Sequence, residues 1–268
     1  MWSTWSRTSG RRTAGSRRWR RRSARSLGEV ARAVAAEVAA ADVAPAVELV
    51  ETAGSVAEQI VRHADDAQLV VLGHETKTPV ERLVTGATTG NVARSSPVPA
   101  VVVPDDWRAD ASSRGVVAVG LRDPGHADAL LGVAFAAAAA RGSSLRVVHA
   151  WALPNPYADA VELRTHGPVW DEAARTMAAG VLEEWRRAYP MVPVTVEVVH
   201  DDPAQALVKA SADADLLVVL RRKLPVLGPH LGRVGRAVLR SAACPVAVVP
   251  ADEMLGLAAV EKAGTMLR

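Results

Sequence analysis

Four basic side chains surround one loop of the sequence and could bind an anion. They follow an apolar run at 216–220 and are Arg221, Arg222, Lys223 and Arg233. An arginine presents a planar fork of N–H donors that can hold a phosphate group by two of its oxygens. The same residues could instead form a solvated rim without a ligand. The sequence therefore leaves two hypotheses for this loop, phosphate binding and plain surface charge.

Other chemistries have little support in the residue pattern. The seven histidines are scattered, with no pair at i, i+4, and the single cysteine, Cys244, has no partner for a metal site or an intramolecular disulfide. His149 is expected to end a strand rather than to bind a metal. There is no G-x-S-x-G nucleophile motif, and no pair of carboxylates stands out as an acid and a base. A lone cysteine also fits a reducing, cytoplasmic compartment.

The basic loop belongs to a segment that occurs twice. Residues 68–104 recur in altered form at 215–250. Each copy contains an apolar run, a loop, a segment with helical spacing and a valine-rich run bounded by prolines. Continuous runs of Val and Leu are typical of strands that are covered on both faces, as in a parallel sheet between helices. Each copy is therefore predicted to form a strand, a loop, a helix and a second strand.

The repeat extends upstream of these segments, but not equally in the two copies. Residues 47–61 align with 194–208 at an offset of 147, and Gly86 aligns with Gly232 at an offset of 146. Nothing before Glu29 resembles 114–170, so the first copy is truncated at its N-terminal side. We predict helices at 29–43, 55–63, 88–95, about 125–141, 171–188 and from 202, and strands at 47–51, 69–72, 100–103, 116–119, 145–149, 194–198, 216–220 and 246–249.

The N-terminal arm, residues 1–28, differs in composition from the rest. It carries nine arginines and no acid, with Trp2, Trp5 and Trp19 between them, whereas the whole chain has a net charge of only +3. The remaining body is therefore acidic and does not resemble a binder of phosphate backbones. We expect the arm to be disordered. It either binds nucleic acid or an anionic membrane surface, or results from a misassigned start or a frameshift.

The predicted organisation follows from these boundaries. The arm is followed by a partial domain at 29–104, a polar linker at 105–113, a complete domain at 114–251 and a C-terminal tail at 252–268. The longest apolar run, 130–140, is shorter than the roughly 20 residues that a membrane-spanning helix needs. No membrane span is predicted.

Three stretches carry a resemblance to a known family. They are VVAVG at 116–120, LRVVHAW at 145–151, and a glycine-spaced loop that leads through a short helix to CPVAVVP at 244–250. Over roughly 29–251 the chain resembles a tandem universal stress protein. The resemblance implies a flavodoxin-like α/β fold, also described as adenine nucleotide alpha hydrolase-like, with five parallel strands in the order 3-2-1-4-5. The first copy would be an N-terminally truncated version of it.

The resemblance also implies an association surface. Members of this family dimerise through the last strand of the sheet. In a tandem chain the strand from Ala100 to Val103 could pair with the strand from Val246 to Val249. Alternatively, these strands could hold a second copy of the chain or another protein partner.

Nucleotide-binding members of the family carry G-x2-G-x9-G-[ST] after the fourth strand. Its glycines let backbone N–H groups approach phosphate oxygens, and the helix that follows adds a favourable dipole. The first copy keeps Gly73 and Gly86 but has Thr76 and Ala87 at the second glycine and at the hydroxyl position. Thr88 could supply the hydroxyl.

The second copy departs further from the motif. It has Leu220 at the first glycine and Arg222 near the second, and it keeps Gly232, followed by Arg233 and Val234. On the other side of the implied site, relatives place an aspartate two residues after Gly120, where this chain has Arg122, and Ala150 stands at the position that contacts adenine. The phosphate motif is thus degraded in both copies.

The sequence as a whole predicts a cytoplasmic, non-catalytic stress-response module. It would act in regulation or protein interaction, with weak or no nucleotide binding and no required cofactor. The alternative is an ATP-binding stress sensor with slow or no hydrolysis, which would use Gly232 and the nearby arginines. A third hypothesis assigns nucleic-acid or membrane binding to the arm.

Overall fold

The computed structural model describes residues 48, 50, 52–74, 81–108, 113–125, 127–224 and 228–251. The arm, the tail, the helix expected at 29–43 and most of the strand expected at 47–51 lie outside the described residues. None of the helices within these ranges is long and apolar enough to cross a membrane.

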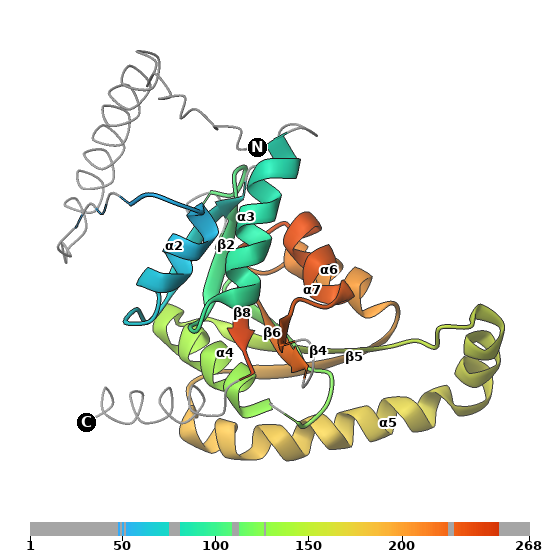
Figure 1. Cartoon of the computed structure of the whole chain (residues 1–268). Helices are drawn as coiled ribbons and strands as arrows, with labels where there is room; N and C mark the ends of the chain where they lie inside the picture. The colour runs from blue at the N-terminus through green and yellow to red at the C-terminus, as the bar shows by residue number, and fades with distance from the viewer. Residues whose placement is uncertain are drawn as a thin grey trace, which may run out of the picture. The chain divides into compact units, whose positions relative to one another are not determined.

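One continuous sheet joins the two copies of the repeat (Figure 1). Along the main path of the sheet, neighbouring strands run parallel except where β2 and β8 are antiparallel; off this path, β7 (Gly228–His230) pairs antiparallel with β6. In spatial order the strands are β1 (Val70–His74), β2 (Ala100–Pro104), β8 (Val246–Pro250), β6 (Leu216–Leu224), β3 (Val116–Gly120), β4 (Ser144–Trp151) and β5 (Val194–His200).

The predicted α/β class is confirmed, but the sheet is larger than one five-stranded unit. Counted within the second copy alone, β3, β4, β5, β6 and β8 lie in the order 3-2-1-4-5 and are all parallel. The sheet does not stop at β8, because β2 and β1 of the first copy extend it. The first copy contributes only these two strands among the described residues.

The junction between the copies is the pairing of their last strands. Ala100 lies opposite Val248, Val101 opposite Ala247 and Val102 opposite Val246. Both strands also have a parallel neighbour on the other side, so their backbone edges are used within the chain. A homodimer or a protein partner on these strands stays a prediction, and it would have to use their faces or exchange strands between chains.

Helices cover the sheet in two layers. On one face, α4 (Ala127–Arg141) and α5 (Pro156–Ala188) pack on the second copy. Phe135 of α4 stacks on Trp185 at 5.8 Å between ring centroids, and Tyr189 contacts both rings, in a core made mainly of Val, Leu and Ala. The other face carries α6 (Pro203–Ala212), α7 (Arg233–Ser241) and α3 (Glu81–Ser95), with α2 (Val56–His63) beside α3.

The start of α5 was predicted wrongly. We expected a loop up to about Asp171, because prolines interrupt the segment, but the helix begins at Pro156. Asn155 caps it by accepting hydrogen bonds from the backbone N–H groups of Tyr157 and Ala158. A proline in the first turn needs no N–H partner, so Pro156 starts the helix rather than preventing it. Pro168 lies inside α5, whose first part projects beyond the sheet in Figure 1.

Two further differences lie near the expected phosphate loops. β6 continues as a strand to Leu224 and turns back into β7 (Gly228–His230), where a loop was expected from Arg221. In the first copy, α3 begins at Glu81 rather than near Thr88. Both differences change which backbone groups can reach a ligand.

Candidate functional site

In an open parallel sheet, ligands bind outside the carboxyl ends of the strands, where the strand order reverses. In the second copy this point lies between β3 and β6. Gly120 ends β3, Ala150 lies near the end of β4, and α7 starts directly after Gly232. The structure therefore brings the second-copy candidates to one edge of the sheet.

Gly120 is explained by packing. A Cβ atom added at this position would lie 2.9 Å from Cδ1 of Leu207 on α6, which is closer than real side chains approach. The absence of a side chain here lets α6 pack closely on the end of β3. The glycine thus has a structural role whether or not a ligand binds.

The residues at the adenine and aspartate positions offer little to a nucleotide. Arg122 is exposed and lies 3.7 Å from the carboxylate of Asp123, and such exposed pairs stabilise proteins very little. Ala150 is half-buried in β4 opposite Val199 and has no polar side-chain atom. His149 Nδ1 lies 3.0 Å from the carbonyl oxygen of Leu121, so this histidine connects β4 to the segment after β3. In the described part of the chain no group of side chains could hold a metal ion.

A β-hairpin occupies the place of the phosphate loop. Arg222 pairs with His230, Lys223 with Pro229 and Leu224 with Gly228 in an antiparallel ladder. A phosphate cradle needs successive backbone N–H groups that point to one centre, whereas a ladder directs them at the neighbouring strand. The expected loop at Arg221 and Arg222 is therefore wrong.

Arg221 is buried and binds the first copy. Its side chain is 8% exposed, and its guanidinium donates hydrogen bonds to the carbonyl oxygens of Ser96 at 2.7 Å and Ala93 at 3.4 Å. These carbonyls end α3, where a positive charge interacts favourably with the helix dipole. Burial lowers the pKa of Arg221 from its ordinary value. This arginine connects the two copies and does not face a phosphate.

Arg233 has a carboxylate partner. Its guanidinium lies 2.7 Å from Oδ2 of Asp202, whose Oδ1 accepts hydrogen bonds from the N–H groups of Ala204 and Gln205 at the start of α6. The contact with Arg233, followed by these backbone bonds, holds the pKa of Asp202 below its usual value. Val234 packs against the core on this face, so its side chain does not point to a ligand.

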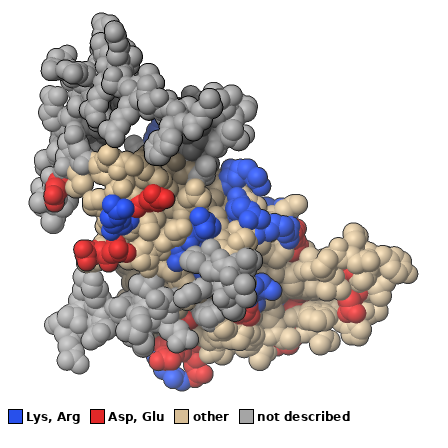
Figure 2. All heavy atoms as spheres, viewed as in Figure 1, with Lys and Arg blue, Asp and Glu red and all other residues tan. Residues whose placement is uncertain are grey.

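Some positive charge remains at this end of the second copy. Arg222, Arg233 and Arg236 are exposed here, whereas the exposed Arg240 lies in the last turn of α7. Figure 2 shows Lys and Arg side chains gathered on the face over α6 and α7. Gly232 gives α7 no side-chain cap, so the first turn of the helix keeps N–H groups that a side chain does not satisfy.

The first-copy candidates do not form a phosphate loop. Gly73 lies within β1, opposite Val103. Gly86 and Thr88 lie inside α3, beyond its first turn, so Gly86 does not begin the helix as Gly232 does. The segment between β1 and α3 lies outside the described residues.

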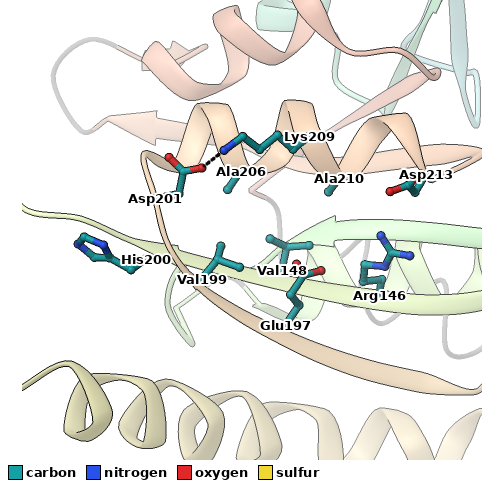
Figure 3. A pocket seen from close by; sticks show the side chains of 10 residues that line it. All are labelled: Arg146, Val148, Glu197, Val199, His200, Asp201, Ala206, Lys209, Ala210 and Asp213. Atoms are coloured by element: carbon teal, nitrogen blue, oxygen red, sulfur yellow. Dashed lines mark hydrogen bonds and ion pairs between the residues drawn. The ribbon is translucent and has the colours of Figure 1, made fainter. Parts of the chain in front are cut away.

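A groove that sequence reasoning did not identify lies beside this edge. It has a volume of about 340 Å³ and runs between α6 and the strands β4 and β5 (Figure 3). Arg146, Glu197 and Asp213 are among its lining residues. The available signal was a charged residue in each of two valine-rich strands, LRVV and VTVEVV.

The comparisons with known proteins decide the family. The family model described as "Universal stress protein family" matches residues 6–104 and 114–250. The chain belongs to the universal stress protein family. The first match begins within the arginine-rich arm, and the second covers the strands β3 to β8.

Curated relatives agree with this assignment. Universal stress protein Rv2005c of Mycobacterium tuberculosis is 34% identical over 193 residues, which cover 70% of this chain and 64% of the relative. A universal stress protein of Mycolicibacterium smegmatis is 31% identical over 199 residues, covering 73% and 66% of the two chains. This chain thus spans about two thirds or less of the length of these relatives.

Solved structures show the fold. A universal stress protein from Archaeoglobus fulgidus superposes with a TM-score of 0.58 at 21% identity, over 84% of this chain and 76% of that one. A universal stress protein in complex with cAMP matches 53% of this chain and 100% of that one at 24% identity. Its TM-score is 0.36.

Proposed function

We propose that this protein is a non-catalytic stress-response module of the cytoplasm, which acts through regulatory or protein contacts and binds nucleotide weakly or not at all. The observation that carries the proposal is the β6–β7 hairpin at the place of the phosphate loop. In the described strands of the hairpin, 222–224 and 228–230, the ladder directs the backbone groups at the neighbouring strand and leaves no cradle for phosphate oxygens.

The side chains around the hairpin support the same proposal. Arg221 already donates a hydrogen bond to a carbonyl oxygen at the end of α3, and Arg233 already forms an ion pair with Asp202. A phosphate that bound Arg233 would approach the carboxylate of Asp202, because this carboxylate stays hydrogen-bonded to the first turn of α6. The repulsion between the two anions would oppose binding.

Calorimetric titration of the full chain with Mg-ATP tests this proposal. We expect no heat of binding up to about 1 mM ATP, which corresponds to an affinity weaker than about 4 kcal/mol. A micromolar dissociation constant would overturn the proposal. The R222Q/R233Q double variant and a matched R164Q control, at an exposed site on α5, would then show whether the basic residues at the hairpin bind the nucleotide.

An ATP-binding stress sensor is the second candidate, and one observation favours it. The exposed arginines beside α7 and the uncapped start of that helix place positive charge and N–H donors at the same end of the sheet. This function predicts micromolar binding that is lost in R222Q/R233Q and kept in R164Q. Hydrolysis would be slow or absent.

A further inference from the structure

The groove between α6 and the strands β4 and β5 contains charged side chains that do not neutralise one another. Arg146 projects from β4, Glu197 from β5, and Asp213 follows the end of α6. In Figure 3, Arg146 and Glu197 point from the strands into the gap below α6, and Asp213 lies on the helix side of it. Among the described residues, none of the three side chains makes an ion pair or a hydrogen bond.

The other charges of the groove are already paired. Lys209 Nζ lies 2.6 Å from Oδ2 of Asp201, and this contact holds the pKa of the Asp201 carboxyl below its usual value. The pair lies toward the start of α6, whereas Arg146 and Asp213 lie toward its end (Figure 3). At one end of the groove the charged side chains therefore pair with each other, whereas the other end has one unpaired cation and two unpaired carboxylates.

His200 also lines the groove, and its Nε2 atom lies 2.9 Å from the carboxylate of Asp159. The remaining lining residues are apolar. Val148 and Val199 form the strand side, and Ala206 and Ala210 form the helix side. Small-molecule sites typically combine apolar walls with a few polar groups that orient the ligand, at volumes of roughly 300–1,000 Å³. A groove of about 340 Å³ is at the small end of this range and suits a ligand of amino-acid size.

We propose that this groove binds a small zwitterion, with its carboxylate on the guanidinium of Arg146 and its ammonium group between Glu197 and Asp213. An arginine can hold a carboxylate by two parallel hydrogen bonds, and an ammonium group has three donors for carboxylate oxygens. A ligand with a single charge would pair either with Arg146 or with the two carboxylates, but not with both. The methylene groups between the two charges would contact Val148 and Ala210.

This site is separate from the nucleotide site considered above. It uses the β4–β5 side of the sheet and α6, whereas the hairpin, Gly232 and Arg233 follow β6. The proposal therefore does not depend on the function proposed above. A failure of ATP to bind has no bearing on it.

A series of ω-amino acids tests the proposal on the full chain. Glycine, 4-aminobutyrate and 6-aminohexanoate carry the same two charged groups, separated by an increasing number of methylene groups, so their affinities show which separation the groove accepts. Acetate and methylammonium each carry one of the two charges. We expect at least one zwitterion to bind at least about tenfold more tightly than either single ion, as measured by calorimetry and protein-observed NMR.

Two substitutions inside the groove and two outside it locate the binding. R146Q and E197Q should each lower the affinity for the most tightly bound zwitterion by about tenfold. R164Q and E184Q, at exposed positions on α5, should leave this affinity unchanged. Glu197 is exposed, so E197Q remains informative even if R146Q disturbs the fold. Absence of zwitterion binding up to about 10 mM, or binding that survives both groove substitutions, would overturn the proposal.

Discussion

The two copies of the repeat bury corresponding residues to very different extents. Leu69 and Val71 in the first copy are 48% and 62% exposed, whereas Leu216 and Val218, 147 positions later, are 5% and 0% exposed. In the second copy, α4 covers this face of the sheet. No helix among the described residues takes its place over β1. A valine-rich strand therefore specifies a sheet position, but other segments decide whether its side chains are buried.

A second contrast concerns the helix that follows each phosphate motif. In the second copy α7 starts directly after Gly232, whereas in the first copy α3 already includes Gly86. The end of α3 is bound by Arg221 of the second copy. The copies are thus dissimilar parts of one sheet, and each depends on contacts made by the other.

Placing a charge at the matched valines should give the largest difference between the copies. V218D would bury a carboxylate without a partner in the core and should lower the free energy of unfolding by about 4 kcal/mol or more. V71D replaces an exposed valine and should change the free energy of unfolding by less than about 0.5 kcal/mol. Urea denaturation of both variants measures the two values, and a similar loss in both would show that the β1 face is covered in solution.

Removing the arginine that connects the copies should have the next largest effect. R221M leaves the buried carbonyl groups of Ala93 and Ser96 without their donor and should destabilise the protein by about 2 kcal/mol. The neighbouring variant R222M serves as the control, because Arg222 is exposed. Hydrogen exchange should show faster exchange of the α3 amides in R221M only. Equal exchange in both variants would mean that Arg221 does not stabilise α3.

Removing the cap residue at matched positions of the two copies should change the free energy of unfolding by a smaller amount. Asp202 caps α6 with its side chain, whereas Ser55, the corresponding residue before α2, makes no such hydrogen bond. D202A should therefore cost about 1 kcal/mol at neutral pH, and S55A almost nothing. Thermal or urea denaturation of the two variants compares them directly.

The cost of D202A should depend on pH. Because the pKa of Asp202 is lower in the folded than in the unfolded state, its contribution is fully present above the unfolded value of about 4. The contribution is lost as the pH falls through the lower, folded value. A difference between D202A and the unaltered protein that persisted at the lowest pH at which both remain folded would contradict this assignment.

Replacing the buried Cys244 should have the smallest effect on stability, and its thiol should not react in the folded protein. The residue is fully buried, and burial raises its pKa to about 12. A thiol-specific reagent at pH 8 should therefore leave the native protein unlabelled, and urea should restore labelling. The first copy has Val98 at this position, and C244V should change the free energy of unfolding by less than about 1 kcal/mol. Rapid labelling without urea would show that this end of β8 opens.

The sequence predicted the elements whose signal is local. The strands β3, β6 and β8 each contain a continuous apolar run, and the family resemblance implied that the last strands of the two copies, β2 and β8, could pair. The start of α5 was missed because Pro156 was read as a break, although the Asn155 cap and a first-turn proline are a start signal. The hairpin was missed because a family motif led us to expect a loop.

The site was harder to predict because its contacts connect distant parts of the chain. Arg221 and Ser96 are 125 positions apart, and nothing near either residue indicates the other. Arg233 lies 31 positions from Asp202. Basic residues in a loop look alike in a sequence whether they face solvent, a phosphate or a helix end. Only the folded chain distinguishes these environments.

The antiparallel junction of β2 with β8 has a consequence for how the protein responds to dilution. Two separate chains joined through their last strands would dissociate below their dissociation constant. Here 105–113 connects the partners covalently, and a short connection sets an effective concentration in the millimolar range. The junction should therefore remain closed at nanomolar protein, so that the pairing does not depend on how much of the protein a cell makes.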